Sequence, residues 1–237
     1  MAERLINRNK SVTVAADVEA DQLIPLTQAT HGVEGIGAYK IGIALGLELG
    51  LPEVVKRMRE HTDLPIIYDH QKAGNDIPEM DKTFANVCWK GGVDAVIFFP
   101  FSSPVTEERW IKAAQDQGLG VLVGGHMTVP KFLESEGGYI ADSAPERIYR
   151  LGAELGVKDF VVPGNKVQYV EKYRQLLEEI LGPNNFMLHA PGFIGQGGVI
   201  SDFALNAGEI WDAIVGSAIY KATDMRAAAE QMTAQIR

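Results

Sequence analysis

The sequence predicts an α/β protein of the (β/α)₈ TIM-barrel class. Eight short, apolar, β-rich runs recur along the 237 residues, and segments with helical spacing lie between them. The runs are apolar on both faces, as is typical of a parallel sheet covered by helices. Eight such units in about 250 residues are the signature of a (β/α)₈ barrel. An open, doubly wound sheet is the alternative.

The strands are expected, in order, at residues 12–18, 37–42, 65–69, 94–99, 120–125, 159–164, 186–190 and 212–216. After the third strand, the apolar spacing of a helix is present in Ile77, Phe84, Val87 and Cys88. After the fifth strand, residues 143–146 read Ser-Ala-Pro-Glu, a capping-box pattern that predicts the start of another helix.

The longest interval between strands runs from Gly125 to Lys158. Residues 131–144 within it exceed the usual length of a βα loop, and extra length of this kind often covers a site. We therefore expect a lid there. No linker, low-complexity tract or repeat divides the chain, so residues 1–237 are expected to form a single barrel domain.

Composition excludes several classes of protein. Hydrophobic residues make up 46% and charged residues 22%, which argues against disordered and coiled-coil chains. The net charge of −9 makes nucleic acid an unexpected partner. No apolar run is long enough to span a membrane, and no signal peptide is visible, so the protein is expected to be cytoplasmic without membrane partners. Cys88 is expected to be a buried, unreactive side chain.

Polar residues cluster at the carboxyl ends of the predicted strands, where barrels of this class carry their active sites. They are Asp17, Lys40, Asp69, Lys72, Asp76 and Thr128. An acidic residue after a strand is commonly just the N-cap of the next helix, which is one reading of each aspartate taken singly. The set as a whole can be a structural salt-bridge network. The same set can hold a lysine as a proton donor beside a fixed carboxylate. Spacing alone leaves both readings open.

Glycine-rich segments follow the last two predicted strands. Residues 190–198 read APGFIGQGG, and residues 215–217 read VGS. Loops at these positions of a barrel commonly bind phosphate through backbone N–H groups. The composition therefore indicates a phosphate site, although glycine also serves ordinary turns.

Six segments together resemble the orotidine 5′-monophosphate decarboxylase family. They are AADV with Asp17, YKIGIALGLELGLP with Lys40, YDHQKAGNDIP, GGHMTVP, PGFIGQGG and AIVGSAIY, and the resemblance runs over nearly the whole chain. The resemblance implies a (β/α)₈ barrel that works as a homodimer with shared active sites, and a nucleotide as the small-molecule substrate.

The resemblance also implies roles for individual residues. Lys40, Asp69, Lys72 and Asp76 match the family's charged tetrad, whose last aspartate reaches the neighbouring subunit's site. Asp17 and Lys40 would bind ribose hydroxyls, Thr128 the pyrimidine ring, and Ile77 would pack near the base. Gln196 would bridge the ring and the phosphate. Phosphate binding would fall to the loops that contain Pro191, Gly197, Gly198, Gly216 and Ser217.

Three departures from the family pattern stand out. The family reads Asp, one residue, Lys, two residues, Asp, whereas two residues separate Asp69 from Lys72 and three separate Lys72 from Asp76. His70 or Asn75 is therefore an alternative to an aspartate at one of the family's two carboxylate positions in this segment. Met80 replaces a threonine, and Ser217 stands where the family has a phosphate-binding arginine.

The implied reaction is loss of CO₂ from C6 of orotidine 5′-monophosphate to give uridine 5′-monophosphate. Lys72 would stabilise the developing carbanion and deliver the proton, with no metal and no cofactor. One alternative is a Mg²⁺-dependent sugar-phosphate decarboxylase or hexulose-phosphate synthase, in which the second strand ends in an acidic metal ligand instead of Lys40. Another is a barrel that binds a nucleotide without catalysis, suggested by Met80 and Ser217.

Overall fold

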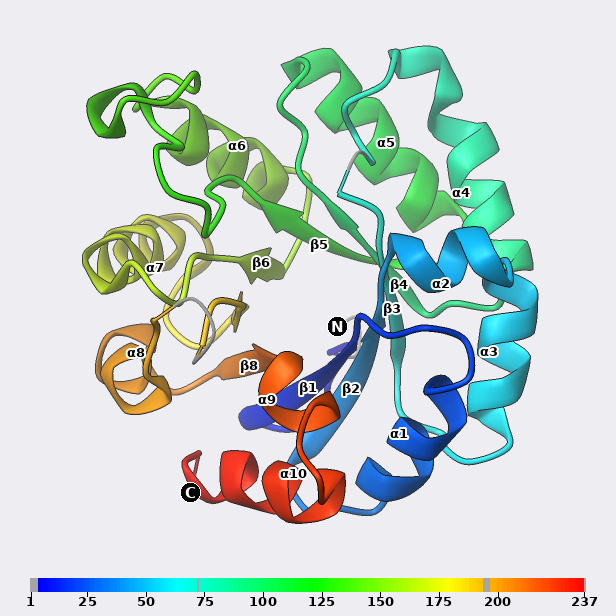
Figure 1. Ribbon diagram of the computed structural model, residues 1–237. Helices are drawn as coiled ribbons and strands as arrows, with labels where there is room; N and C mark the ends of the chain where they lie inside the picture. Colours follow the sequence, from blue (N-terminus) through cyan, green and yellow to red (C-terminus); the bar gives the residue numbers. More distant parts are fainter. Residues whose placement is uncertain (1–3, 72, 194–196, 237) are drawn as a thin grey trace.

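The computed structural model describes residues 4–71, 73–193 and 197–236. Eight parallel strands form a closed barrel in chain order, and Figure 1 shows them at the centre with helices around them. They are β1 (Lys10–Ala16), β2 (Ile36–Ile41), β3 (Ile66–Asp69), β4 (Ala95–Phe98), β5 (Gly120–Gly124), β6 (Asp159–Val161), β7 (Met187–Ala190) and β8 (Trp211–Val215). The predicted barrel class and all eight strands are confirmed. The open sheet is wrong, because β8 pairs with β1.

Helices cover the outside of the barrel. They are α1 (Leu23–Thr30), α2 (Ile43–Glu48), α3 (Leu51–Arg59), α4 (Asp81–Lys90), α5 (Pro104–Asp116), α6 (Ala144–Glu154), α7 (Val167–Leu181), α8 (Ile200–Ala207), α9 (Ser217–Tyr220) and α10 (Met225–Ala234). Among the described residues, no helix is long and apolar enough to cross a membrane.

Two helix starts differ from the sequence prediction. Ile77 is extended, as expected for a residue before proline, and a 3₁₀ turn at Pro78–Met80 precedes α4, which begins only at Asp81. At α6 the predicted capping box is wrong. Ser143 already has helical φ and ψ, so its side chain caps no backbone N–H. A serine cap occurs instead at α5, where Ser103 is extended and its Oγ accepts from Thr106 N at 3.1 Å.

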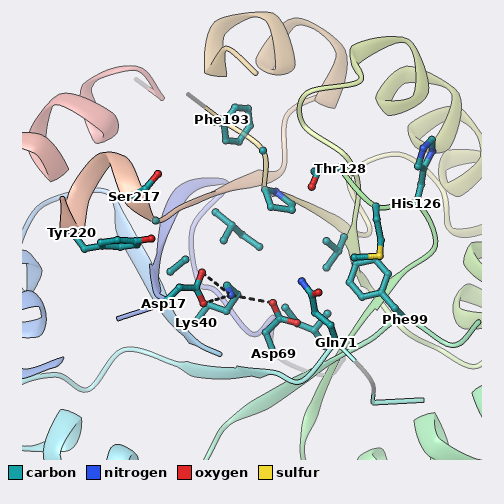
Figure 2. Close-up of a pocket in the computed structure, with 18 residues that line it drawn as sticks. Asp17, Lys40, Asp69, Gln71, Phe99, His126, Thr128, Phe193, Ser217 and Tyr220 are labelled. Atoms are coloured by element: carbon teal, nitrogen blue, oxygen red, sulfur yellow. Dashed lines mark hydrogen bonds and ion pairs between the residues drawn. The ribbon is translucent and has the colours of Figure 1, made fainter. Parts of the chain in front are cut away.

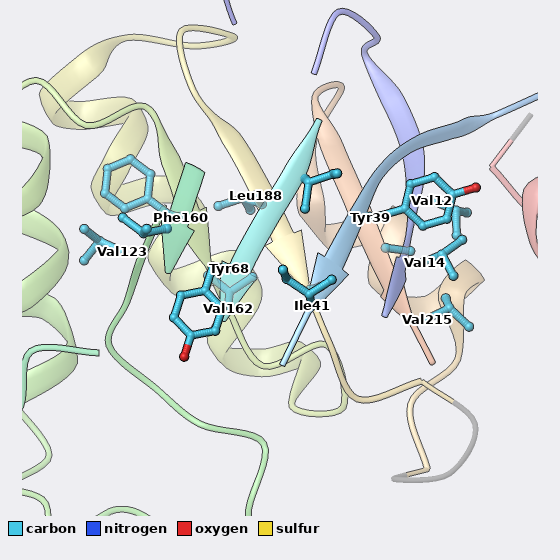
Figure 3. Packing of buried hydrophobic residues seen from close by; sticks show 14 of the residues in the cluster. Val12, Val14, Tyr39, Ile41, Tyr68, Val123, Phe160, Val162, Leu188 and Val215 are labelled. Carbon is cyan, nitrogen blue, oxygen red and sulfur yellow. The ribbon is translucent and has the colours of Figure 1, made fainter. Parts of the chain in front are cut away.

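Side chains alternate along each strand between the barrel interior and the helix layer. Figure 3 shows part of the outward set, including Val12, Val14, Tyr39 and Ile41. The inward set fills the barrel with a separate apolar cluster that contains Ala38, Ile67, Ile97, Leu122 and Val161. Lys40 and Asp69 follow two members of this inward set by two residues. The strand periodicity therefore directs both charges to the axis, near the carboxyl ends.

A buried polar layer lies at the opposite end of the barrel interior. His189 is fully buried, with Nδ1 3.2 Å from Asp212 Oδ2 and Nε2 2.9 Å from Asp159 Oδ1. Ser11 Oγ donates to Asp212 Oδ1 at 2.6 Å. Asp159, Asp212 and Ser11 occupy the first or second position of their strands. This layer is therefore remote from the mouth where the strands end.

The long β5–α6 connection folds back on itself. Leu133 and Ile140 form a bridge, and the carboxylate of Glu136 accepts the backbone N–H groups of Phe132 and Leu133. Lys166 pairs with Glu136 at 2.8 Å and ties this connection to the start of α7. Residues 139–141 border a cleft between α5 and α6, not the cavity at the barrel mouth. A lid movement of residues 131–144 stays a prediction.

Candidate active site

A cavity of about 270 Å³ opens at the carboxyl ends of the strands. Side chains from many strands line it, and Figure 2 shows how they face a common space. Of the predicted site residues, the lining contains Asp17, Lys40, Asp69, Thr128, Pro191, Gly216 and Ser217. The position of the cavity agrees with the location of active sites in barrels of this class.

Lys40 is the central charge on one wall of the cavity. Its Nζ donates to the two oxygens of Asp17 at 3.1 and 3.4 Å, and lies 3.0 Å from Asp69 Oδ2. The side chains of Lys40 and Asp69 are each 9% exposed, whereas that of Asp17 is half exposed. β1, β2 and β3 are neighbours in the barrel, so their carboxyl ends bring the three side chains together (Figure 2).

The two carboxylates keep Lys40 charged. Burial by itself would lower the pKa of Lys40, but Asp69 and Asp17 outweigh burial, and the pKa is raised above its usual value. One oxygen of Asp69, Oδ1, is buried and has no hydrogen-bond partner among the described residues. The wall therefore offers a fixed cation and an acceptor oxygen to a bound molecule. Lys72, the predicted proton donor, lies outside the described residues.

Two neighbouring side chains of the β3–α4 connection, His70 and Gln71, point in different directions. Gln71 faces the cavity beside Asp69, a contact that the sequence reasoning missed (Figure 2). His70 instead lies against Tyr68, with Nδ1 2.5 Å from the Tyr68 hydroxyl, and lines a different cleft on the outside of the barrel. The structure thus removes His70 from the carboxylate position that the altered spacing left open.

Asp76 and Ile77 do not reach the cavity of their own chain. Asp76 lines the same outer cleft as His70, and Ile77 is 58% exposed. Hydrogen bonds hold the segment in place, because Thr106 Oγ1 donates to Asp76 O at 3.3 Å and Trp110 Nε1 donates to Ile77 O at 3.2 Å. The segment is fixed on the surface beside the barrel mouth.

The opposite wall carries Thr128 and His126. Asn165 Nδ2 donates to Thr128 O at 3.1 Å and so fixes the turn that presents the threonine. His126 is buried between Tyr173, 2.8 Å from Nδ1, and Lys166, 3.0 Å from Nε2. Burial, reinforced by the Lys166 ammonium, lowers the pKa of His126 to about 4, so this ring is neutral at pH 7. This wall is uncharged where it meets the cavity.

The glycine-rich loops only partly reach the cavity. Pro191, Gly216 and Ser217 line it, whereas Gly197 and Gly198 do not, and Gln196 lies outside the described residues. Gly198 has a structural role, because its N–H donates to Gly192 O at 3.0 Å and a Cβ there would lie 2.6 Å from that oxygen. The sequence reasoning missed three aromatic lining residues, Phe99, Phe193 and Tyr220. The available signal was the position of Phe99 directly after β4 and of Phe193 in the predicted phosphate loop, whereas Tyr220, at the end of α9, had none.

Comparisons with known proteins agree on one family. A model described as "Orotidine 5'-phosphate decarboxylase / HUMPS family" matches residues 10–232. A relative from Methanosarcina barkeri, named orotidine 5'-phosphate decarboxylase, is 31% identical over 234 residues, which cover 98% of this chain and 96% of the relative. A relative of the same name from Methanosarcina mazei is 29% identical over 233 residues, covering 98% and 97%.

Solved structures give the same fold. A crystal structure of orotidine 5'-phosphate decarboxylase from Pyrococcus horikoshii has a TM-score of 0.77 at 25% identity and covers 95% of this chain and 99% of that one. The Methanocaldococcus jannaschii orotidine 5'-monophosphate decarboxylase complexed with the inhibitor BMP has a TM-score of 0.83 at 21% identity, covering 97% and 100%.

Proposed function

This chain belongs to the orotidine 5′-phosphate decarboxylase / HUMPS family, and from that we propose that it removes CO₂ from orotidine 5′-monophosphate to give uridine 5′-monophosphate. The reaction makes it a carboxy-lyase of pyrimidine synthesis. The observation that supports this most directly is Lys40, held between Asp17 and Asp69 in a cavity at the mouth of the barrel.

The proposed chemistry centres on Lys72. The bond from C6 to the carboxylate breaks and CO₂ leaves, so that the electron pair stays on an sp² carbon. An ammonium group at that carbon stabilises the charge and then gives up its proton to C6. Asp69 would hold the lysine charged and in place, for which its Oδ1, buried and without a partner in the part of the chain that the structure describes, is suited. No metal and no cofactor take part.

Substrate binding divides between the two walls. Asp17 and Lys40 would bind ribose hydroxyls, and Thr128, with Gln196, would contact the pyrimidine ring. The phosphate would lie at the ends of β7 and β8, near Pro191, Gly216 and Ser217, with the backbone N–H of Gly197 from the adjoining loop. The N–H of Gly198, which was also predicted to bind phosphate, already donates to Gly192 O. The phosphate lies far from the reacting carbon C6. Its binding energy would therefore be used to orient the substrate.

Lys40 also favours metal-free decarboxylation over the Mg²⁺-dependent alternative. An ammonium group held at 3.0 and 3.1 Å from the two carboxylates would repel a divalent cation from them. The assay follows the absorbance of orotidine 5′-monophosphate with and without EDTA. We expect full turnover in EDTA. Turnover restored only by Mg²⁺ would favour the sugar-phosphate enzymes, and binding without turnover would favour the non-catalytic barrel.

We further propose a homodimer in which each subunit completes the other's site. Asp76 and Ile77 lie outside the cavity of their own chain, and the side chains of Ile77 and Met80 expose apolar surface beside the mouth. An exposed apolar segment next to a site is a typical contact surface for a second copy. Asp76 and Ile77 would then enter the partner's cavity.

Mixed dimers test the shared site. Subunits with Asp76→Asn and subunits with Lys72→Ala should each be inactive alone. A mixed dimer holds one site free of both changes, so an equal mixture should recover about a quarter of wild-type activity. The measurement is turnover after denaturation and joint refolding, with heterodimers verified by two affinity tags. Verified heterodimers without recovered activity would rule out an intersubunit Asp76.

Ser217→Arg tests the phosphate position. Ser217 lines the cavity, and the resemblance to the family implies a phosphate-binding arginine at this position. A charge-assisted contact contributes about 1.5 to 3 kcal/mol. We expect the KM for orotidine 5′-monophosphate to fall about tenfold or more, and inhibition by inorganic phosphate to strengthen. The control is Ala218→Arg, because Ala218 is not part of the lining. If KM and phosphate inhibition do not change, another cation such as Lys166 or Lys221 already binds the phosphate.

A further inference from the structure

A second cleft lies outside the barrel, between α5 and α6. Its volume of about 400 Å³ is within the range of small-molecule pockets. Residues 100–104 of the β4–α5 loop form one side, and α6 with residues 139–141 forms the other. The cleft shares no lining residue with the cavity at the barrel mouth. It is therefore independent of the proposed decarboxylation.

The walls of the cleft are mostly apolar. Phe101, Ile140, Ile148 and Leu151 contribute aromatic and aliphatic surface. The two serines of the lining are already engaged, since Ser102 Oγ donates to Gly74 O at 3.0 Å and Ser103 caps α5. Few polar groups are thus left to define what binds there.

Glu107 is the one acidic residue of the lining, and its surroundings are unusual for a carboxyl group. It is 3% exposed, and no described residue pairs with its Oε1. Burial, with no opposing charge, raises the pKa of Glu107 to about 8. Arg147 and Tyr139 are the other titratable residues of the lining, and both are exposed at the rim.

An unpartnered buried acid destabilises a protein. The same position on α5 would accept glutamine or leucine, which carry no charge to bury. The carboxyl group of Glu107 thus has a role that no described contact accounts for. Its place in the lining of an open, apolar cleft lets a partner from solution approach it.

We propose that this cleft binds a small organic amine, whose ammonium group pairs with Glu107 and whose apolar body lies against Phe101, Ile140 and Ile148. On binding, the neutral acid of Glu107 releases its proton to solvent, and a carboxylate–ammonium ion pair forms in its place. The occupant would lie against the β4–α5 loop, which also holds Asn75, because Phe101 N donates to Asn75 Oδ1 at 2.7 Å.

The test uses two probes of matched shape and opposite charge, phenethylammonium and 3-phenylpropionate. Calorimetric titration of the full chain at pH 7 should detect binding of phenethylammonium only. Repeating the titration in buffers of different ionisation enthalpy should show release of close to one proton for each ammonium bound. Equal binding of both probes, or no binding of phenethylammonium at millimolar concentration, would overturn the proposal.

Three variants locate the binding. Glu107→Gln should weaken phenethylammonium binding at least tenfold and abolish proton release. Glu108→Gln is the matched control, because Glu108 is the adjacent residue on α5, pairs with Lys112 and does not line the cleft. Arg147→Gln should leave affinity unchanged or raise it, since a cation is removed from the rim. Loss of affinity in Arg147→Gln would indicate an anionic ligand and contradict the proposal.

A stability measurement tests whether the Glu107 variant is folded. Burying the Glu107 carboxyl group lowers the free energy of unfolding, and Glu107→Gln removes that destabilisation. The variant should therefore melt at a higher temperature than the wild type at pH 8. A lower melting temperature would mean that Glu107 already has a structural partner. The same conclusion would follow if sedimentation showed that Glu107→Gln separates a dimer, since a second copy would then cover the cleft.

Discussion

Replacing Lys72 with alanine is expected to lower kcat for orotidine 5′-monophosphate by about 10⁴-fold or more. General acid catalysis contributes about 10²- to 10⁴-fold, and a fixed charge at the developing carbanion adds a comparable electrostatic effect. Both effects depend on the same ammonium group in the proposed mechanism. The measurement is single-turnover decay of substrate absorbance, which separates the chemical step from product release.

A matched lysine controls for the change in net charge. Lys90 is an exposed residue at the end of α4, and Lys90→Ala should turn over at the wild-type rate. Binding of uridine 5′-monophosphate by Lys72→Ala should persist, because the proposed phosphate and ribose contacts belong to other residues. Turnover near the wild-type rate in Lys72→Ala would exclude lysine as the proton donor.

The polar layer inside the barrel should make stability depend on pH. Burial alone would lower the pKa of His189, but its hydrogen bonds to Asp159 and Asp212 outweigh burial and raise the pKa to about 9. A histidine with a raised pKa stabilises the folded state fully below about pH 6.5 and loses that effect as pH rises through 9. We expect the free energy of unfolding to fall by up to about 3 kcal/mol across this range.

Removing the His189 side chain should lower the free energy of unfolding at any pH where Asp159 and Asp212 are charged. His189→Leu leaves two carboxylates without their shared cation, and breaking a buried ion pair costs about 3 to 5 kcal/mol. The control is the triple variant His189→Gln, Asp159→Asn, Asp212→Asn, which removes all three charges. Urea unfolding at pH 6, 7.5 and 9 measures each free energy. If the triple variant keeps the full pH dependence of the wild type, the charge of His189 is not its source.

The sequence by itself determined the barrel and the location of its mouth. Each strand is a short apolar run, and burial of both faces in a parallel barrel makes such runs stand out from the helices. The strand-end positions predicted that Asp17, Lys40, Asp69 and Thr128 meet at the mouth, and all four line one cavity. Pro191 and Ser217, from the glycine-rich segments after the last two strands, line it as well. These features follow from local pattern alone.

Only the tertiary structure decided the direction of side chains on the loops. His70 and Asp69 are adjacent in sequence, yet Asp69 faces the cavity while His70 turns outward to Tyr68. Gly197 and Gly198 belong to the predicted phosphate loop but do not line the cavity. Loop backbones follow no repeating period, so their side-chain directions depend on contacts with distant residues.

The same reason applies to Glu107 and His189. Glu107 lies three and four residues before Trp110 and Ile111, on the buried face of α5, and the packing of α6 beside α5 decides that a cleft lies next to it. His189 falls at a strand end in the sequence, yet Asp212 from β8 and Asp159 from β6 flank it inside the barrel. The environment of a charged group is set by residues brought together on barrel closure, and local sequence pattern carries no record of those neighbours.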